Sequence, residues 1–318
     1  MASLLAKAIR YEFPETIPVS VFALPAVWLK YGEAFQKIAD RYPQFFGGFQ
    51  YNPNQFQYAP TYHAGTHTDE WGCVWSNIQE GMEAIVTGHP VKSEEDVYAL
   101  NIPDDRSGRF PHGFMYLRLL DLCGFELAMT MFAEEDEAIQ TLVDKVLTYN
   151  CAQMEVILPH LGEIASFGDD LGMQNALAIG PVRWRKYLKP CYARLYGMIK
   201  QAKPDTLVYM HTDGCIHEII PDLAECGVDM VNPQIRANGL DNLVRVCKGK
   251  IPVFLDLDRQ LFPFATPVQL KEHVRECVEA LYLPEGGLGL NLELGADIPL
   301  ENMEALLEAV ETYRHYKG

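Results

Sequence analysis

Two adjacent carboxylates, Asp169 and Asp170, are the residues of this chain whose types and spacing most directly suggest chemistry. They follow a short apolar run, Ile164 to Phe167, and lie in a glycine-bearing turn. Two neighbouring anions at the end of a strand repel each other, so a fold retains them there only with a compensating cation, metal or substrate. Because Asp-Asp-x-Gly is also common in turns and helix caps, the alternative is a structural role. Asp169 and Asp170 are therefore candidate catalytic residues.

Polar side chains also end the later strand-like runs, in the order His211 and Asp213, Asn232 and Gln234, Asp256 and Asp258, and Glu293. Residues at i and i+2 of an extended segment point to the same side, so His211 and Asp213 can face a common site. With Glu293 brought alongside by the closing strand, they form a candidate His/Asp/Glu metal set. The alternative for His211 is a hydrogen-bonded histidine at the end of a strand.

The segment from His63 to Trp75 combines histidine, acidic and aromatic residues. A helix that would bring its two histidines together as metal ligands is disfavoured by Gly65 and two threonines. We expect the carboxylates of Asp69 and Glu70 to face a pocket. Trp71 and Trp75 are expected to form its walls. An aromatic-walled pocket suits an aromatic or otherwise flat substrate. The alternative is a packed, amphipathic insertion with surface histidines.

Strand-like and helical runs alternate regularly from Glu163 onward. Strands are expected at residues 164–167, 206–210, 228–231, 253–257 and 288–292. Helices are expected at residues 181–201, 216–226, 240–247, 267–281 and 300–313. Strand–helix units of this kind imply a parallel sheet with helical crossovers.

The first half of the chain adds strands at residues 19–22 and 114–119, and helices at 123–132 and 137–156. Seven clear strands with an eighth unplaced point to a (β/α)8 barrel, a single α/β domain over residues 1–318. Residues 44–109, rich in aromatic residues, Pro, Gly and His, break the rhythm and are expected to form an insertion near the barrel mouth. A doubly wound fold is the alternative, but no GxGxxG follows the first strand.

Composition narrows the class of protein. A formal charge of −17 argues against a nucleic-acid partner, and 48% hydrophobic with 22% charged residues describes a globular chain with a substantial core. No apolar run approaches a transmembrane helix, and the first residues lack the long apolar stretch of a signal peptide. Eight cysteines without a CxxC pair indicate reduced thiols rather than a disulfide framework. We expect a cytoplasmic enzyme without a membrane partner.

Together these segments resemble the uroporphyrinogen decarboxylase superfamily, whose members are (β/α)8 barrels. The resemblance covers about Asp69 to the C-terminus and rests on a combination of individually weak motifs. These are Gly168-Asp169-Asp170-Leu171-Gly172-Met173-Gln174, Pro181-x-x-Trp184-Arg185-x-Tyr187-x-Lys189-Pro190, His211-x-Asp213-Gly214, Gly227-Val228-Asp229-x-x-Asn232-Pro233, Asp258-x-Gln260 with Thr266-Pro267, and Gly286-Gly287 with Pro299-Leu300-Glu301-Asn302.

The superfamily contains two main classes of enzyme. True uroporphyrinogen decarboxylases carry an N-terminal Arg-Gln-Ala-Gly-Arg stretch that binds substrate carboxylates, whereas residues 18–26 of this chain contain no arginine. A site for a substrate with eight carboxylates needs such cations, so we reject that activity. The other class comprises cobamide-dependent methyltransferases, of which those acting on coenzyme M bind zinc through a His-x-Cys pair and a distant Cys. This chain has His211-x-Asp213 and Glu293 instead.

Oxygen and imidazole ligands leave zinc a harder, stronger Lewis acid, which suits an ether or phenolate oxygen better than a thiol. The resemblance therefore implies the methyltransferase component of an O-demethylase system, acting on a small methylated substrate. Zinc on His211, Glu293 and Asp213 would stabilise the leaving phenolate, and cob(I)alamin on a partner corrinoid protein would attack the methyl carbon. The chain has no Asp-x-His-x-x-Gly cobalamin fingerprint, so the corrinoid would come from that partner.

In this mechanism Asp169 or Asp170 would orient the substrate or supply a proton. The expected substrate-binding residues are Asp69, Glu70, Trp71, Asn232, Gln234 and Asp256. Two other functions remain open: a metal-free decarboxylase or lyase of a small acid, and a non-catalytic protein that binds a corrinoid or small molecule. The sequence decides neither the methyl donor nor whether a corrinoid or a folate accepts the methyl group. It is compatible with a homodimer but does not determine the oligomeric state.

Overall fold

The computed structural model describes residues 2–318 as two compact units, each treated separately below. Unit 1 contains the described residues up to Gly65, together with Ser76–Ile85 and Gln234–Gly318. Unit 2 contains Thr66–Trp75 and Val86–Pro233. The assignment of residues 1–318 to one domain stays a prediction. Among residues 2–318, no helix is both long and apolar enough to cross a membrane.

Three parallel strands form the sheet of unit 2, in the order β5 (Ile164–Gly168), β6 (Leu207–Thr212) and β7 (Met230–Pro233). Helices α9 (Gly180–Tyr187), α10 (Lys189–Ala202) and α11 (Ile220–Glu225) connect them. All four residues of β7 are buried, as expected for a parallel sheet with both faces covered. The register aligns Gly168 with His211 and His211 with Asn232, so these residues form one row across the strands.

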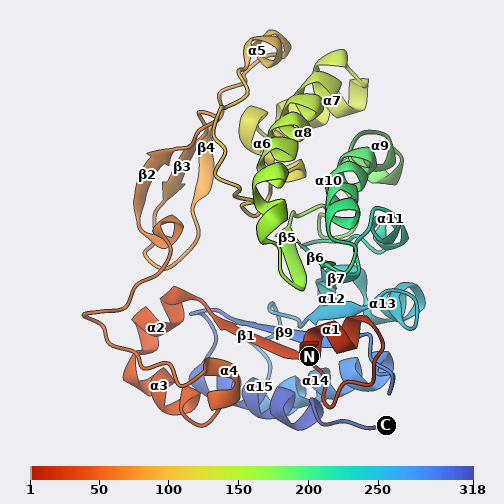
Figure 1. Cartoon of the computed structure of the whole chain (residues 1–318). Coiled ribbons are helices and arrows are strands. Elements are labelled where there is room, and N and C mark those ends of the chain that lie inside the picture. The colour runs from red at the N-terminus through yellow and green to blue at the C-terminus, as the bar shows by residue number, and fades with distance from the viewer. Residues whose placement is uncertain (1) are drawn as a thin grey trace. The chain divides into compact units, whose positions relative to one another are not determined.

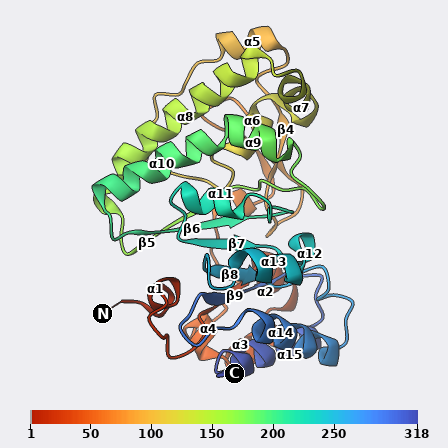
Figure 2. The same ribbon diagram turned by 90° about the vertical axis from the view of Figure 1, so that its right-hand side faces the viewer.

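The rest of unit 2 precedes β5 in the chain and is mostly helical. It includes α5 (Glu94–Ala99), α6 (Tyr116–Cys123), α7 (Phe125–Glu134), α8 (Glu137–Ile157) and the 3-10 helix η2 (Leu158–His160). Helices α8 and α10 lie side by side (Figure 2). Three short strands, most of whose residues belong to unit 2, form a separate sheet in the order β2 (Gly65–Thr68), β3 (Val74–Asn77) and β4 (Ile85–Gly88).

Unit 1 has its own parallel strands, in the order β1 (Val19–Ala23), β9 (Leu288–Leu294) and β8 (Val253–Asp256). Its C-terminal helices α14 (Pro267–Leu281) and α15 (Leu300–Tyr313) pack against each other (Figure 1). The remaining helices are α1 (Leu4–Ile9), α2 (Pro25–Tyr31), α3 (Glu33–Ala39), α4 (Pro43–Phe46), η1 (Pro60–Tyr62), α12 (Ile235–Asn238) and α13 (Leu240–Cys247).

Most predicted elements are confirmed. Helices α13, α14 and α15 have the predicted limits, and each predicted strand from residue 164 onward corresponds to a strand shifted by a few residues at most. The predicted helix at 181–201 is divided at Leu188, and that at 123–132 begins after Gly124, whose φ of 75° interrupts the helix. The helix predicted at 216–226 is shorter, since α11 begins at Ile220.

The predicted strand at residues 114–119 is wrong, because helix α6 begins at Tyr116. The backbone N–H groups of Met115, Tyr116 and Leu117 donate to one buried carboxylate, that of Asp169. These are the unpaired donors of a helix N-terminus, and an anion there stabilises the helix over a strand. A short apolar run does not distinguish the two conformations without this long-range partner.

Several of the family-like motifs have structural roles in unit 2. Arg185 Nη2 and Lys189 Nζ donate to the Asp222 carboxylate at 2.8 and 2.7 Å, which ties α9 and α10 to α11. Burial alone would raise the pKa of Asp222, but these hydrogen bonds and positive charges lower it below its usual range. Asp229 accepts from Lys200 and from the backbone N–H of Val208 at the start of β6.

We predict that Asp222→Asn lowers the free energy of unfolding at pH 7 by on the order of 1–2 kcal/mol. Because the pKa of Asp222 is lower in the folded state, its stabilisation is present above the unfolded-state pKa and is lost as pH falls through the folded-state pKa. Urea unfolding of both proteins across this acid range should show the difference shrinking. The control Glu225→Gln removes another carboxylate partner of Lys189. Because the Glu225 side chain is 68% exposed, this change should alter the free energy of unfolding little. An equal loss at every pH would contradict this account.

Candidate functional site

The loops that follow β5 and β6 lie backbone against backbone. The N–H of Gly172 donates to the carbonyl of Asp213 at 3.1 Å, and the N–H of Cys215 donates to the carbonyl of Met173 at 2.7 Å. A Cβ atom on Gly172 would lie 2.3 Å from the nitrogen of Cys215, and one on Gly214 would lie 2.1 Å from the carbonyl carbon of Gly172. Only glycine permits this approach at both positions. The two sequence motifs are thus two halves of one loop contact.

This contact fixes the acidic groups between the loops. The backbone N–H of Asp213 donates to Asp170 Oδ1 at 2.9 Å, and the N–H of Leu171 donates to the hydroxyl of Thr212 at 3.1 Å. The N–H of Asp169 donates to the carbonyl of His211 at 3.0 Å. The Asp170 carboxylate is therefore held against the end of β6 by the backbone of the neighbouring loop.

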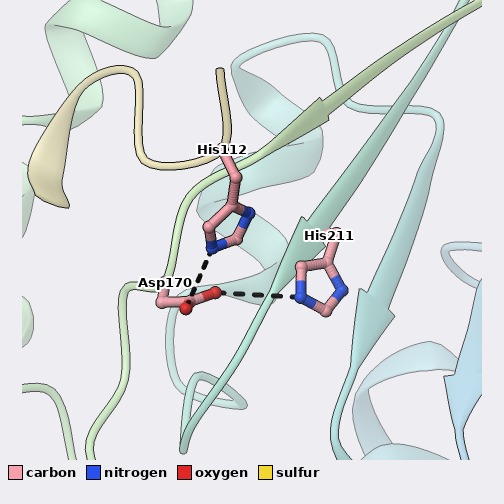
Figure 3. A group of neighbouring side chains, drawn as sticks. All are labelled: His112, Asp170 and His211. Carbon is pink, nitrogen blue, oxygen red and sulfur yellow. Dashed lines mark ion pairs between the residues drawn. The ribbon is translucent and has the colours of Figure 1, made fainter. Parts of the chain in front are cut away.

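His112, Asp170 and His211 form the candidate centre, in which each residue offers one potential metal-ligand atom within 4.8 Å of the others. Dashed lines join the Asp170 carboxylate to both imidazole rings (Figure 3). Its Oδ2 atom is 3.0 Å from His112 Nε2, and its Oδ1 atom is 3.8 Å from His211 Nε2. Asp213 adds a second carboxylate, with Oδ1 3.2 Å from His211 Nε2. Two imidazoles and two carboxylates therefore converge at the carboxyl ends of β5 and β6.

Asn232 orients His211. Its Oδ1 atom lies 2.7 Å from His211 Nδ1, so the imidazole donates from Nδ1 and directs Nε2 toward the carboxylates. Asn232 is only 2% exposed and is adjacent to His211 in the strand register. Burial alone would lower the pKa of His211, but Asp213, Asn232 and Asp170 raise it to about 9.

His112 reaches the site from the loop before α6. A Cβ atom at residue 168 would lie 2.6 Å from His112 Nδ1, so Gly168 gives the ring the space to lie over the end of β5. Burial alone would lower the pKa of His112, but the hydrogen bond and charge of Asp170 raise it. The side chain is 45% exposed, compared with 26% for Asp170 and for His211. His112 is thus the most accessible member of the centre.

Asp169, the other predicted catalytic carboxylate, is completely buried. In addition to the three N–H groups at the start of α6, it accepts a hydrogen bond from the Tyr192 hydroxyl at 2.6 Å. Burial raises its pKa, against the lowering effect of these donors. This environment suits a structural anion that anchors α6, and of the two neighbours only Asp170 faces the histidines.

The predicted substrate residues Asp69, Glu70 and Trp71 lie in unit 2 among internal partners. Asp69 accepts from Arg118 Nη1 at 2.6 Å, from Trp75 Nε1 at 3.0 Å and from the backbone of Trp71 and Cys73. Trp71 is 4% exposed and packs against Tyr149, whose hydroxyl donates to Glu70 at 3.2 Å. Trp75 stacks on His67. These contacts give Asp69 and Trp71 structural roles, and their part in substrate binding stays a prediction.

The other predicted residues belong to unit 1. Glu293 is the next-to-last residue of β9 and accepts from Arg259 Nη1 at 2.6 Å. Arg259 Nε lies 3.2 Å from Asp256 Oδ2, and Asp256 is 1% exposed and pairs with Gln234 in a parallel bridge. The structure therefore gives Glu293 a guanidinium partner within its own unit. Its assignment as a metal ligand, and the substrate-binding roles of Gln234 and Asp256, stay predictions.

Sequence reasoning missed His112 and Arg259. His112 stands between Pro111 and Gly113 in a segment that was expected to enter a strand, which gave the histidine no place at the carboxyl ends of the strands. The usable signal was the Pro-His-Gly turn itself, since a histidine in a loop is more often functional than one in a core. Arg259 is the unspecified middle residue of the Asp258-x-Gln260 motif, so the motif gives it no role.

Comparison with known proteins identifies the family. Residues 119–313 match the family described as Uroporphyrinogen decarboxylase (URO-D). The match spans more than half of the chain, and the chain belongs to this family. A search of proteins of curated function found no match.

Among solved structures, a methyltransferase from Methanosarcina mazei is similar to this chain, with a TM-score of 0.69, 15% sequence identity and 98% of each chain covered. With the family match, this similarity confirms the predicted α/β barrel fold class over the doubly wound alternative. A dihydropteroate synthetase covers 54% of this chain and 64% of its own at 16% identity, and its TM-score of 0.35 supports no conclusion.

We predict that Gly214→Ala destabilises the protein by about 3 kcal/mol or more, because φ is +83° and the new methyl group would overlap the backbone of Gly172. The matched control is Gly197→Ala in α10, where a Cβ atom meets nothing within 4 Å. The control should be neutral or stabilise the helix by about 0.5–1 kcal/mol. Chemical denaturation compares the two variants, and equal effects would contradict the close loop contact.

Proposed function

We propose that this chain is a zinc-dependent methyltransferase that moves a methyl group from a methoxylated, aromatic donor to the cob(I)alamin of a separate corrinoid protein. The observation that carries the proposal is the convergence of His112, Asp170 and His211, with Asp213 beside them. The fold similarity to a methyltransferase supports the same kind of reaction. The lack of arginine in residues 18–26 argues against the decarboxylation of a polycarboxylate.

The donor set fits zinc. Imidazole nitrogens and carboxylate oxygens are common zinc ligands, and catalytic zinc sites use three protein ligands with one open position. The orientation of His211 by Asn232 is the arrangement that a ligating histidine needs, because one nitrogen is fixed by a hydrogen bond and the other is presented to the site. His112, Asp170 and His211 would hold the metal, with Asp213 as a further candidate. Glu293, proposed from the sequence, would have to leave Arg259 to join them.

Zinc would supply Lewis acidity toward the ether oxygen of the donor. The residues of the chain prepare the site for this task. Asn232 fixes the ring of His211, and the backbone of Asp213 holds one oxygen of Asp170. Asp213 lies close enough to His211 Nε2 to orient a donor group or to hold a proton. The exposed edge of the centre at His112 is where a substrate can approach.

A metal-free acid–base enzyme is the second candidate, and one observation favours it. His211 is paired with Asp213, and His112 with Asp170, as histidine–carboxylate pairs that could move protons without a metal. This alternative predicts turnover of a small acid by protein from which all metal has been removed.

We predict that the purified, zinc-supplemented protein retains about one zinc per chain, and that His211→Ala and His112→Ala each lose it. Elemental analysis after dialysis measures the metal content. The control His160→Ala replaces an exposed histidine of η2 and should retain the metal. Full zinc content in both site variants would exclude this centre as the metal site.

The methyltransferase activity itself is tested with chemically reduced cob(I)alamin and a methoxylated aromatic compound. The absorbance of methylcobalamin measures its formation, which should require both the protein and zinc. We predict that Asp170→Asn lowers the rate by 10²-fold or more, on the order of the loss of one positioned catalytic group. Wild-type rates in this variant, or turnover without any metal, would refute the proposed role of the centre.

A further inference from the structure

Unit 1 contains a cavity of about 460 Å³ whose walls are mostly aromatic. Val21, Phe22 and Ala23 at the carboxyl end of β1 form one side of it. Phe22 is the register partner of Glu293 on β9, so the cavity opens where two parallel strands of this unit end. In α/β barrels the carboxyl ends of the strands carry the ligand-binding groups. The cavity is therefore in the part of the unit where a substrate is expected.

Trp28 is the central ring of the wall. It is 5% exposed, and its centroid lies 4.9 Å from that of Phe49 and 6.2 Å from that of Phe46, both at steep angles. Phe56 continues the wall from Phe49, with ring centroids 6.1 Å apart. Edge-to-face packing of this kind holds the rings in fixed orientations, so the aromatic wall is already formed before a ligand binds. The volume lies within the range of small-molecule sites.

The charges around the cavity select the ligand. None of the residues that line it carries a formal charge, and the polar ones are Gln57, Tyr58 and Tyr62. The Tyr58 hydroxyl donates to Glu80, and the Tyr62 hydroxyl donates to Glu83 at 2.9 Å. The wall thus offers no cation to an anionic ligand. The carboxylates of Glu80 and Glu83 would repel such a ligand. An anionic ligand would lose its hydration without gaining a counter-charge in the wall.

Both tyrosines keep their protons. The hydrogen bond to Glu80, followed by burial, raises the pKa of Tyr58 to about 12, and burial with the charge of Glu83 raises the pKa of Tyr62 further above its usual value. Because each hydroxyl hydrogen is given to a glutamate, the tyrosine oxygens can act toward a ligand only as acceptors. A ligand that carries one hydroxyl donor on an otherwise apolar ring satisfies this arrangement.

We propose that this cavity binds the ring of an uncharged methoxyphenol and discriminates against methoxybenzoates. The inference rests on the proposed function for the identity of the methylated group, but the cavity and its selectivity belong to unit 1 alone. Trp28 and the phenylalanines around it would supply the aromatic wall of this cavity, and the walls expected from Trp71 and Trp75 in unit 2 stay a prediction.

The test is a binding measurement by isothermal titration calorimetry on the full-length, metal-free protein, which keeps it separate from turnover. The probes are 2-methoxyphenol and 2-methoxybenzoate at pH 7. We expect 2-methoxyphenol to bind about tenfold or more tightly than 2-methoxybenzoate. Phe49→Ala, at a position 42% exposed, should weaken its binding by about tenfold, whereas Phe264→Ala, at a position 87% exposed and outside the cavity, should not.

A second variant is designed to strengthen binding, because a misfolded protein could lose binding but would not gain it. Gln57→Lys places a cation in the wall and should strengthen the binding of 2-methoxybenzoate. Equal or tighter binding of 2-methoxybenzoate by the wild type, or no effect of Phe49→Ala and Gln57→Lys, would overturn the inference. Selective binding of 2-methoxyphenol without methyl transfer would leave the inference intact and count against the proposed function.

Discussion

The backbone contact between the loops that follow β5 and β6 is the constraint on which the rest of the candidate site depends. Gly172 and Gly214 allow the two loops to touch, and the contact presents the N–H of Asp213 to the carboxylate of Asp170. A carboxylate held by backbone groups costs little further entropy when it acts, because its position is already fixed. The glycines thus serve the site although neither contributes a functional group.

Two adjacent aspartates have separate tasks in this arrangement. Asp169 turns inward and accepts the N–H groups at the start of α6, which fixes the loop that carries His112. Asp170 turns toward the site and pairs with both His112 and His211. The repulsion between neighbouring anions is relieved because one is surrounded by buried donors and the other faces two imidazoles. The pair therefore links the helix N-terminus to the chemistry of the centre.

The sequence predicts the regular elements well where apolar periodicity is strong and end signals are clear. Helices α13, α14 and α15 have the predicted limits, with Thr266 and Pro267 at the start of α14 as an example of a readable cap. His211, Asp213 and Asp170 were identified from strand ends alone. His112 could not be placed, because the helix that follows it depends on a carboxylate far away in sequence. The ion pairs of Asp69 and Glu293 could not be predicted either, since their arginine partners are distant in sequence.

The most direct test of the central claim is a crystal structure of the zinc-supplemented protein with anomalous scattering measured on both sides of the zinc absorption edge. The account predicts one anomalous peak bonded to His211 Nε2, with His112 and Asp170 among its ligands and Asn232 still bound to His211 Nδ1. A fully occupied zinc held by other residues, with His112 and His211 remote from it, would contradict the account. So would a zinc-soaked crystal without a peak between these side chains.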